Sequence, residues 1–302
     1  MLENLKLGPL YDGFLFLAEA ARNPPLLKAH HHLELELNLV VRGQITYVVG
    51  GRRFTFGQRT LLWMFPAQEH QLVHRTPDAQ NYVAVFKPEM IAWSCRGAAY
   101  EGLKRDTAEG DGVLHTVLDP EIYDLVRKNM DALMEGSLDA DILNREAGFG
   151  LSSDFHFEHG DPDGLNAGLH HLLLLCWRCQ RSGPGPGRAV ALHPSVRRAL
   201  ELLSEQDARD DETQDLSALA SRCGASAAYL SRVFARQVGV PLSRYRNSVR
   251  LGRFWTHYRA PRQPTITEAV YAAGFGSYAQ FYKVFAQAYG CGPRESLSER
   301  AA

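Results

Sequence analysis

Cysteines and long apolar runs are scarce in this sequence. Only five cysteines occur among 302 residues, an odd and scattered set that argues against the disulfide framework of a secreted domain. The longest apolar run, residues 172–177, is far too short to cross a bilayer. The first residues also lack a basic start followed by an uninterrupted apolar core, so we expect no signal peptide. These features favour a reduced, cytoplasmic protein that does not bind a membrane.

Acidic residues are almost absent from one long segment. Residues 216–292 contain ten basic side chains and one acidic side chain, Glu268, which gives this segment a formal charge of +9. The whole chain carries −1, so the remainder carries −10. A basic module joined to an acidic one is typical of a phosphate-binding domain beside a domain that does not bind DNA. The alternative is a solvated helical face, which normally mixes both signs of charge.

One structural unit occurs twice in this basic segment, at residues 216–240 and 266–291. In each copy a short amphipathic helix ends at a glycine, Gly224 or Gly274, a polar turn follows, and a second helix ends in Phe-x4-Gly. This is the sequence form of a helix-turn-helix, whose second helix lies in the major groove of DNA. A connecting helix over residues 242–258 is expected to hold the two recognition helices about one DNA turn, roughly 34 Å, apart.

Helical periodicity predicts which side chains of each copy are exposed. Asp215, Ser226 and Ser277 are suited to cap helices, and apolar residues at i, i+3, i+4 and i+7 face inward. The candidate DNA-binding residues of the first copy are Ala228, Tyr229, Ser231, Arg232 and Arg236. Those of the second copy are Ser277, Tyr278, Ala279, Gln280 and Lys283.

Taken together, these motifs resemble the AraC/XylS family of bacterial transcription regulators over about residues 216–293. The resemblance rests on Ala220, Gly224, Ser226, residues 229–234, Gly239, Arg250, Leu251, Gly274, Phe275, Phe281, Val284, Phe285, Gly290 and Pro293. It implies base-reading sites at Ala228, Ser231 and Arg232, and at Tyr278, Ala279 and Lys283. Arg232 has the best chemistry, because arginine pairs bidentately with guanine at about 1–3 kcal/mol of discrimination.

The chain departs from the family pattern at three places. Phe254 stands where the family usually has a small residue, and Val270 stands where it usually has alanine. The arginine that commonly follows soon after Pro293 is displaced. The first two departures add volume to a packed helix interface, which typically costs about 1–3 kcal/mol unless neighbours shrink. They bear on the angle between the two helix-turn-helix subdomains.

Residues 30–90 predict β structure. Short strands are expected over residues 32–41, 44–49, 52–56, 61–64, 71–74 and 82–86. In the first strand the leucines from Leu33 onward alternate with His32, Glu36 and Asn38 on the opposite face. Many short strands with glycine turns favour a sandwich or barrel. The expected fold class is therefore α+β and multidomain.

Residues of two types that bind metals, histidine and glutamate, gather in this region. His30, His32 and Glu36 form H-x-H-x3-E and share strand parity, so they are expected on one face, and His70 follows on a later strand. The pattern resembles the cupin barrel, whose first motif is complete. The second motif, with Gly57, Pro66 and His70, is one residue short and has Gln68 at its inner glycine. The resemblance implies a barrel that senses a small-molecule effector.

Two interpretations of these four side chains stay open. Three imidazoles and a carboxylate suit a divalent metal such as Zn, Mn, Fe or Ni. Alternatively, the pattern serves internal hydrogen bonds and the barrel binds an organic effector, so that no cofactor is required. His31 and His74 are expected to be ordinary surface or lining residues.

The middle of the chain predicts helices over residues 119–134 and 166–181, joined by an exposed loop that includes residues 152–164. The apolar stripe of residues 169–177 is either core or a homodimer face, and the resemblance favours the dimer face. Cys176 and Cys179 are expected to be a helical pair without special chemistry, because no second CxxC accompanies them.

The predicted organisation is a cupin-like sensor (residues 1–112), a helical dimerisation region (113–182), a Gly/Pro linker (183–188) and a DNA-binding domain (189–302). The predicted function is sequence-specific transcription regulation. The predicted partners are promoter DNA and a small-molecule effector, with RNA polymerase as a further candidate. The protein is expected to be a homodimer. One alternative is a metal-dependent cupin enzyme with an auxiliary helical DNA-binding tail. Another is a regulator that responds to a partner through its helical middle and has an empty barrel.

Overall fold

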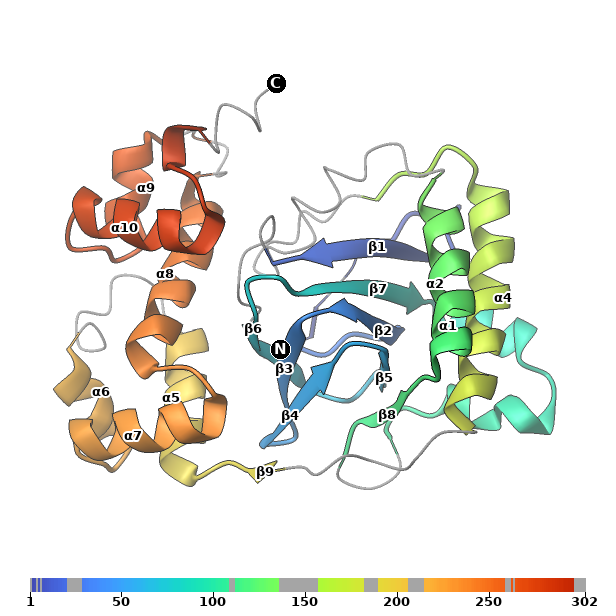
Figure 1. Cartoon of the computed structure of the whole chain (residues 1–302), viewed down its shortest axis with the longest axis horizontal. Helices are drawn as coiled ribbons and strands as arrows, with labels where there is room; N and C mark the ends of the chain where they lie inside the picture. Colours follow the sequence, from blue (N-terminus) through green and yellow to red (C-terminus); the bar gives the residue numbers. More distant parts are fainter. Residues whose placement is uncertain are drawn as a thin grey trace.

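A computed structural model describes residues 2–3, 5, 7–20, 29–108, 112–135, 157–181, 190–205, 215–258, 262 and 264–295. The chain forms a β-rich unit followed by an all-helical unit (Figure 1). The expected α+β multidomain class is therefore confirmed. The predicted linker at residues 183–188 and the first part of the predicted loop, residues 152–156, lie outside the described residues.

The larger of two sheets has the strand order β1-β7-β2-β5-β8. Its strands are β1 (Gly13–Glu19), β2 (Leu35–Arg42), β5 (Thr60–Met64), β7 (Gln80–Phe86) and β8 (Leu114–Val117), each antiparallel to its neighbours. Strand β8 pairs with β5 and so continues this sheet beyond residue 112, where the sequence placed the end of the sensor. Strand β2 begins at Leu35 instead of residue 32, and Leu33 is 63% exposed instead of facing the core.

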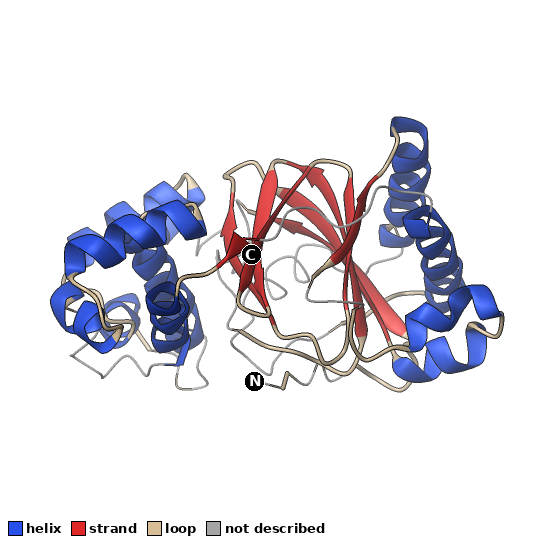
Figure 2. Ribbon diagram, turned by 90° about the horizontal axis from the view of Figure 1, so that it is seen from below, coloured by secondary structure: helices blue, strands red, loops and turns tan. Residues whose placement is uncertain are grey.

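The smaller sheet has the order β6-β3-β4-β9. It contains β3 (Gln44–Val49), β4 (Arg52–Gly57), β6 (His70–Arg75) and the short β9 (Val190–Ala191). Gly50 and Gly51 have φ of 54° and 72°, which suits glycine at the β3–β4 turn. Apolar side chains of both sheets form one core between them. The described strands make two facing sheets and not the closed barrel that the cupin resemblance implied, because among them the strand pairing does not continue from one sheet to the other (Figure 2).

Helices cover the outer face of the larger sheet (Figure 1). They are α1 (Pro88–Ser94), the 3-10 helix η1 (Ala98–Lys104), α2 (Pro120–Met134) and α4 (Pro162–Arg181). On α4, Leu169, Leu172 and Leu173 are fully buried within this chain, and the Trp177 ring packs edge-on against Trp63 at 5.5 Å. The preference for this stripe as a dimer face was therefore wrong, because it is part of the chain's own core.

Helix α2 buries only part of the apolar surface that its sequence carries. Tyr123, Val126 and Met130 face the core. Ile122 and Leu125, which the periodicity placed among the apolar positions of the helix, are 37% and 47% exposed. The helix therefore has a second, outward apolar side.

Six helices are described in the C-terminal unit. They are α5 (Pro194–Glu205), α6 (Leu216–Arg222), α7 (Ala227–Val238), α8 (Leu242–Tyr258), α9 (Ile266–Ala272) and α10 (Tyr278–Tyr289). They build one core around α5 to α7 and a second core around α9 and α10, with α8 contributing to both. Phe254 and Val270 are fully buried in the second core, and the Phe254 ring lies 4.5 Å from that of Phe281. The extra volume at these two positions is thus taken up inside the second subdomain.

Contacts of several kinds join the described parts of the two units. Strand β9 pairs with β4 at Arg52 and Arg53, which places the start of the C-terminal unit on the smaller sheet. The Gln71 side-chain amide donates a hydrogen bond of 3.0 Å to the Tyr245 hydroxyl of α8. Val73 of β6 belongs to the first helical core. Among the described helices, none has both the length and the apolar character that crossing a membrane requires.

Candidate functional site

Helices α6 and α7 form the first helix-turn-helix, and side chains fix where each helix begins. The Asp215 carboxylate accepts hydrogen bonds from the backbone N–H groups of Ser217 and Ala218 at the start of α6. Gly224 has a φ of 65°, which allows the chain to leave α6 in the left-handed conformation. The Ser226 hydroxyl accepts from the Tyr229 N–H at 3.3 Å and begins α7. The predicted caps therefore define the turn.

Helix α7 presents most of the predicted DNA-binding side chains to solvent. Leu230, Val233, Phe234 and Val238 are buried, whereas Ala228, Tyr229, Arg232 and Arg236 are exposed and Ser231 is half-buried. The Tyr229 hydroxyl lies 3.4 Å from His193 Nε2, and the two rings meet edge to face at 5.7 Å. Tyr229 therefore also packs on the segment that enters the domain. Arg232 and Arg236, one turn apart, supply the positive charge on this face.

Helices α9 and α10 repeat the arrangement. Thr265 and Glu268 form a capping box at the start of α9, and Gly274 has a φ of 83° after it. The Ser277 hydroxyl accepts from the Gln280 N–H at 3.2 Å, and the Gln280 side-chain oxygen accepts from the Gly276 N–H at 3.1 Å. Ser277 and Gln280, both predicted to contact DNA, thus fix the beginning of α10.

The remaining predicted residues of α10 divide by exposure. Ala279 and Lys283 are exposed, and Tyr278 is half-buried with its ring 5.8 Å from that of Phe281. Phe281 and Phe285 are fully buried beneath the helix. Tyr282, which the sequence analysis omitted, is 49% exposed on the same helix. Its position four residues after Tyr278 was the available signal.

Arginines also crowd along α8. Burial, together with the charges of Arg246 and Arg253, lowers the pKa of the Arg250 guanidinium to about 10. Burial likewise lowers the pKa of Arg246. A guanidinium remains charged at neutral pH even so. The positive charge predicted for this segment is therefore present on the connecting helix as well as on the two recognition helices.

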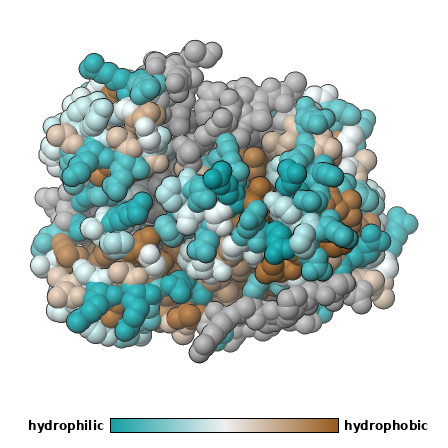
Figure 3. Space-filling view, viewed as in Figure 1, coloured by the Kyte–Doolittle hydropathy of each residue, from teal (hydrophilic) through white to brown (hydrophobic). Residues whose placement is uncertain are grey.

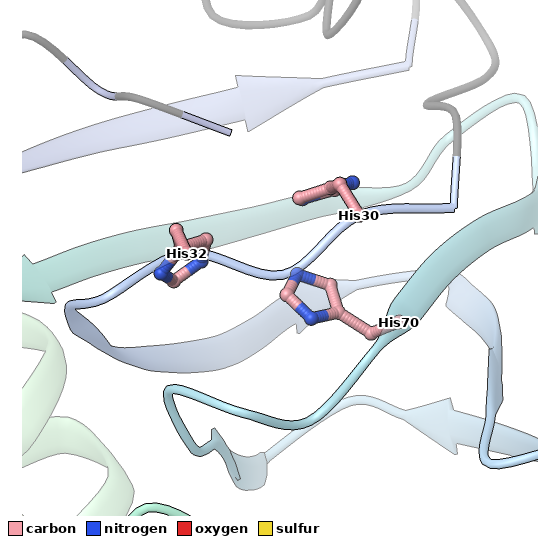
Figure 4. Close-up of side chains that lie close together, drawn as sticks. All are labelled: His30, His32 and His70. Atoms are coloured by element: carbon pink, nitrogen blue, oxygen red, sulfur yellow. The ribbon is translucent and has the colours of Figure 1, made fainter. Parts of the chain in front are cut away.

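The structure brings the four predicted metal or effector residues together in the β-rich unit, and Figure 4 shows the three histidines among them. Ring nitrogens of His30, His32 and His70 all lie within 4.8 Å of one another. The Glu36 carboxylate lies 3.1 Å from His32 Nε2 and 3.7 Å from His70 Nε2. We call these four side chains the histidine cluster. His30 and His32 belong to the segment before β2, so their common side arises from the path of that segment and not from the predicted strand parity.

Burial and neighbouring charges set the protonation of the cluster. Burial opposes ionisation of Glu36, but the hydrogen bond from His32 and the nearby His70 lower the pKa of this carboxyl to about 2. Burial, reinforced by His30, lowers the pKa of His70 to about 3. Burial also acts to lower the pKa of His32, yet the hydrogen bond and charge of Glu36 raise it overall. At neutral pH the cluster therefore combines a carboxylate with a neutral His70, the form of imidazole that ligates metals.

Three further polar side chains support the cluster, and the sequence analysis did not assign them to it. Asn38 donates a 2.6 Å hydrogen bond to Glu36 Oε1, and Asn81 donates a 2.8 Å hydrogen bond to Asn38 Oδ1. Glu3 Oε2 lies 3.3 Å from His30 Nε2. Strand alternation placed Asn38 on the face of Glu36, which was a usable signal. Asn81 and Glu3 are distant in sequence and gave none.

The donor set fits a divalent transition metal. Zinc binds imidazole nitrogen at about 2.0–2.1 Å, so tetrahedral ligands lie about 3.3 Å apart; small ring movements within the observed 4.8 Å would reach this separation. His70 Nε2 is buried and has no hydrogen-bond partner among the described residues. Such an orphaned nitrogen beside a carboxylate is the chemistry of a ligand position.

A cavity of about 380 Å³ opens beside His70. Its walls come from His70 and Gln71 of β6, from the Gly50–Gly51 turn, and from Arg197 and Leu200 of α5. The cavity therefore lies between the sensor and the first helix of the C-terminal unit, and a molecule bound in it would contact both.

Two protein-family models match this chain. A model described as an AraC-like ligand binding domain matches residues 16–151. A model described as a helix-turn-helix domain matches residues 219–298. The first contains all four residues of the histidine cluster, and the second contains both recognition helices.

Solved structures show weaker likenesses. ToxT from Vibrio cholerae, crystallised with an unsaturated fatty acid, is 11% identical, covers 94% of each chain and gives a TM-score of 0.36. The AraC-like transcriptional activator CuxR is 14% identical, covers 88% of this chain and 83% of its own, and gives a TM-score of 0.32. Scores this low carry no argument about this chain. A comparison with curated proteins finds no match.

Proposed function

We propose that this chain, which belongs to the AraC family of DNA-binding transcription regulators, reads an operator with α7 and α10. The observation that carries this proposal is a pair of capped recognition helices that expose Arg232 and Lys283 within a segment of charge +9. Cationic side chains at exposed positions neutralise phosphates and read base edges. The matched families describe regulators, so the alternative of a cupin enzyme is not retained.

Replacement of Arg232 by alanine tests this reading. Arginine pairs with two acceptors of guanine, so Arg232→Ala is expected to remove the preference at one base pair, by about 1–3 kcal/mol, while other positions keep theirs. The measurement is selection of duplexes from a random library with the full chain, followed by titration of each single-base variant. Arg96→Ala is the matched control, because Arg96 is exposed on the β-rich unit.

Two results would count against it. A uniform loss of affinity over all sequences, with the salt slope reduced by about one, would make Arg232 a phosphate contact. If the wild-type chain showed no preference for any duplex over random competitor, sequence-specific regulation itself would be contradicted.

The affinity of the wild-type chain for DNA should also fall as the salt concentration rises, with a slope of several units in a plot of log affinity against log salt concentration.

The histidine cluster and the 380 Å³ cavity beside it are the proposed sensor site. Either a divalent metal or an organic effector would be held by His30, His32, Glu36 and His70. The support is the buried His70 nitrogen that lacks a partner among the described residues. Gln71 follows His70 and is hydrogen-bonded to Tyr245, so a change at the site has a short path to α8. We also propose that the protein acts in the cytoplasm, because promoter DNA and RNA polymerase, its proposed partners, are found there.

We further infer that the chain acts as a homodimer through the outward side of α2. Ile122 and Leu125 are one turn apart there, and Figure 3 shows apolar patches among hydrophilic atoms on the half of the molecule where α2 lies. Exposed apolar surface of this kind favours association between copies. The buried stripe of α4 does not supply this face.

The substitution Leu125→Glu is expected to dissociate this dimer. A carboxylate buried against apolar surface costs several kcal/mol without a partner, so the dimer should become a monomer at micromolar concentration. Sedimentation equilibrium measures the change. Leu10→Glu, at a leucine that is 69% exposed outside α2, serves as the control. A wild-type chain that is monomeric, or a Leu125→Glu variant that stays dimeric, would refute the α2 interface.

A further inference from the structure

A second cavity lies where the β-rich unit meets both helix-turn-helix subdomains. It has a volume of about 110 Å³ and is lined by residues of β6, α8 and α10. Figure 1 shows β6 at the edge of the β-rich unit nearest the helical unit. We call this space the junction cleft. It is separate from the cavity beside His70, with which it shares none of its lining residues.

The charged groups of the junction cleft all have one sign. They are Arg75 of β6 and Arg244 of α8, and His74 of β6 contributes a neutral imidazole beside them. No Asp or Glu is among the described residues that line it, although acidic residues slightly outnumber basic ones in the whole chain, 34 to 33. Burial, followed by the charges of Arg244 and Arg75, lowers the pKa of His74. Both guanidinium groups therefore act on the same space.

Neutral polar groups complete the wall. Asn247 and Ser248 of α8 and Gln287 of α10 line the cleft. Asn247 Oδ1 accepts a hydrogen bond from Arg250, which leaves its amide nitrogen as the donor. The Gln287 amide also carries two donor hydrogens. Donors and positive charge together are the surroundings that stabilise an oxyanion.

We propose that the junction cleft binds a phosphate-sized oxyanion, with Arg75 and Arg244 as its charged ligands. A water occupies about 30 Å³ of liquid volume, so the cleft holds a group the size of three or four waters. This matches a phosphate, a sulfate or a short carboxylate. Guanidinium is suited to all three because its planar fork pairs with two oxygens at once.

The position of the site gives it a regulatory consequence. The oxyanion contacts Arg75 of the sensor, Arg244 of the connecting helix and Gln287 of the second recognition helix. Bound there, it adds a charged contact between the sensor, α8 and α10, which are also joined by apolar packing and by the hydrogen bond from Gln71 to Tyr245. It therefore stabilises this arrangement of the sensor against α8 and α10, and this ligand is distinct from any bound by the histidine cluster.

Titration calorimetry of the full chain in chloride buffer at constant ionic strength tests the proposal, with inorganic phosphate and malonate as probes. One saturable site is expected for at least one probe, and Arg244→Gln should weaken it by about tenfold, equivalent to about 1.4 kcal/mol. Stronger phosphate binding assigns a tetrahedral oxyanion, and stronger malonate binding assigns a carboxylate. Arg244 is exposed, so this variant is expected to fold, whereas Arg75→Gln replaces a half-buried residue and is the second variant.

Two arginines outside the cleft provide the controls. Arg232 is exposed on the DNA-reading face, and Arg96 is exposed on the β-rich unit. The variants Arg232→Gln and Arg96→Gln should both keep the wild-type affinity for the probe. Arg244→Lys should retain part of it. The inference is overturned if the wild-type chain binds neither probe, if Arg244→Gln binds as well as wild type, or if Arg232→Gln loses as much as Arg244→Gln. None of these results depends on DNA binding, so a failure here leaves the proposed function intact.

Discussion

Replacement of Phe281 by alanine is expected to lower the free energy of unfolding of the second helix-turn-helix by about 3–5 kcal/mol. Phe281 is fully buried beneath α10. Its ring lies 4.5 Å from Phe254, 5.3 Å from Phe275 and 5.4 Å from Phe285. Removing it leaves a cavity that three rigid rings cannot fill by small movements. Whole domains are stable by only about 5–15 kcal/mol, so most of the stability of this subdomain would be lost.

The effect should be local and should abolish operator binding. Hydrogen exchange of the full chain would show loss of protection in α9 and α10 with β2 and β7 unchanged, because the second core is separate from that of the sheets. Tyr282→Ala, at the neighbouring exposed position, is the control and should change the free energy of unfolding by less than about 0.5 kcal/mol. Unchanged protection of α10 in Phe281→Ala would show that the aromatic core does not hold the helix.

The helical C-terminal unit is readable from sequence because its determinants are local. Gly224 and Gly274 adopt the left-handed backbone, and Asp215, Ser226 and Ser277 cap the helices that follow them, as their spacing predicts. Connecting helix α8 begins and ends at the expected residues. Local signals do not separate a capping role from a DNA contact, so Ser277 and Gln280, which fix the start of α10, stay predicted DNA contacts.

The β-rich unit shows where sequence reasoning fails. Which face of a helix is buried depends on the elements that pack against it. The apolar stripe of α4 was therefore predicted as a dimer face and proved to be core, while Ile122 and Leu125 of α2 proved to be exposed. Sheet closure depends on hydrogen bonds between distant strands, which alternation does not encode. Strands β8 and β9 are too short to carry a pattern, and the apolar run of β1 lacks the alternation from which the other strands were predicted.

The two candidate ligand sites differ in how far they could be predicted from local sequence. The histidine cluster was predicted because three of its members lie within one short motif of matching chemistry. The junction cleft was not, because Arg75 and Arg244 are far apart in the chain and meet only when β6 packs against α8. His74, expected to be an ordinary surface or lining residue, also lines the cleft.

Removal of one histidine decides between the two interpretations of the cluster. If it holds a metal, the full chain stripped with a chelator should bind one equivalent of Zn²⁺ or Co²⁺, and His70→Ala should weaken binding by at least about 100-fold. Loss of a partner outside the ligand set alone typically costs about 10–100-fold, and a direct ligand contributes more. Cobalt absorption spectra report the number of nitrogen ligands, and calorimetry with Zn²⁺ gives the affinity.

Substitutions elsewhere on the same elements keep this test independent of folding. His74→Ala removes an imidazole from the same strand, four residues away and outside the cluster, and should leave metal affinity unchanged. His30→Ala alters the cluster from the segment before β2 and should reproduce the loss seen in His70→Ala. Equal metal binding by all of these variants, or none by the wild-type chain, would contradict a metal site. The low pKa of Glu36 and the neutral state of His70 would then serve the internal hydrogen bonds of the sensor.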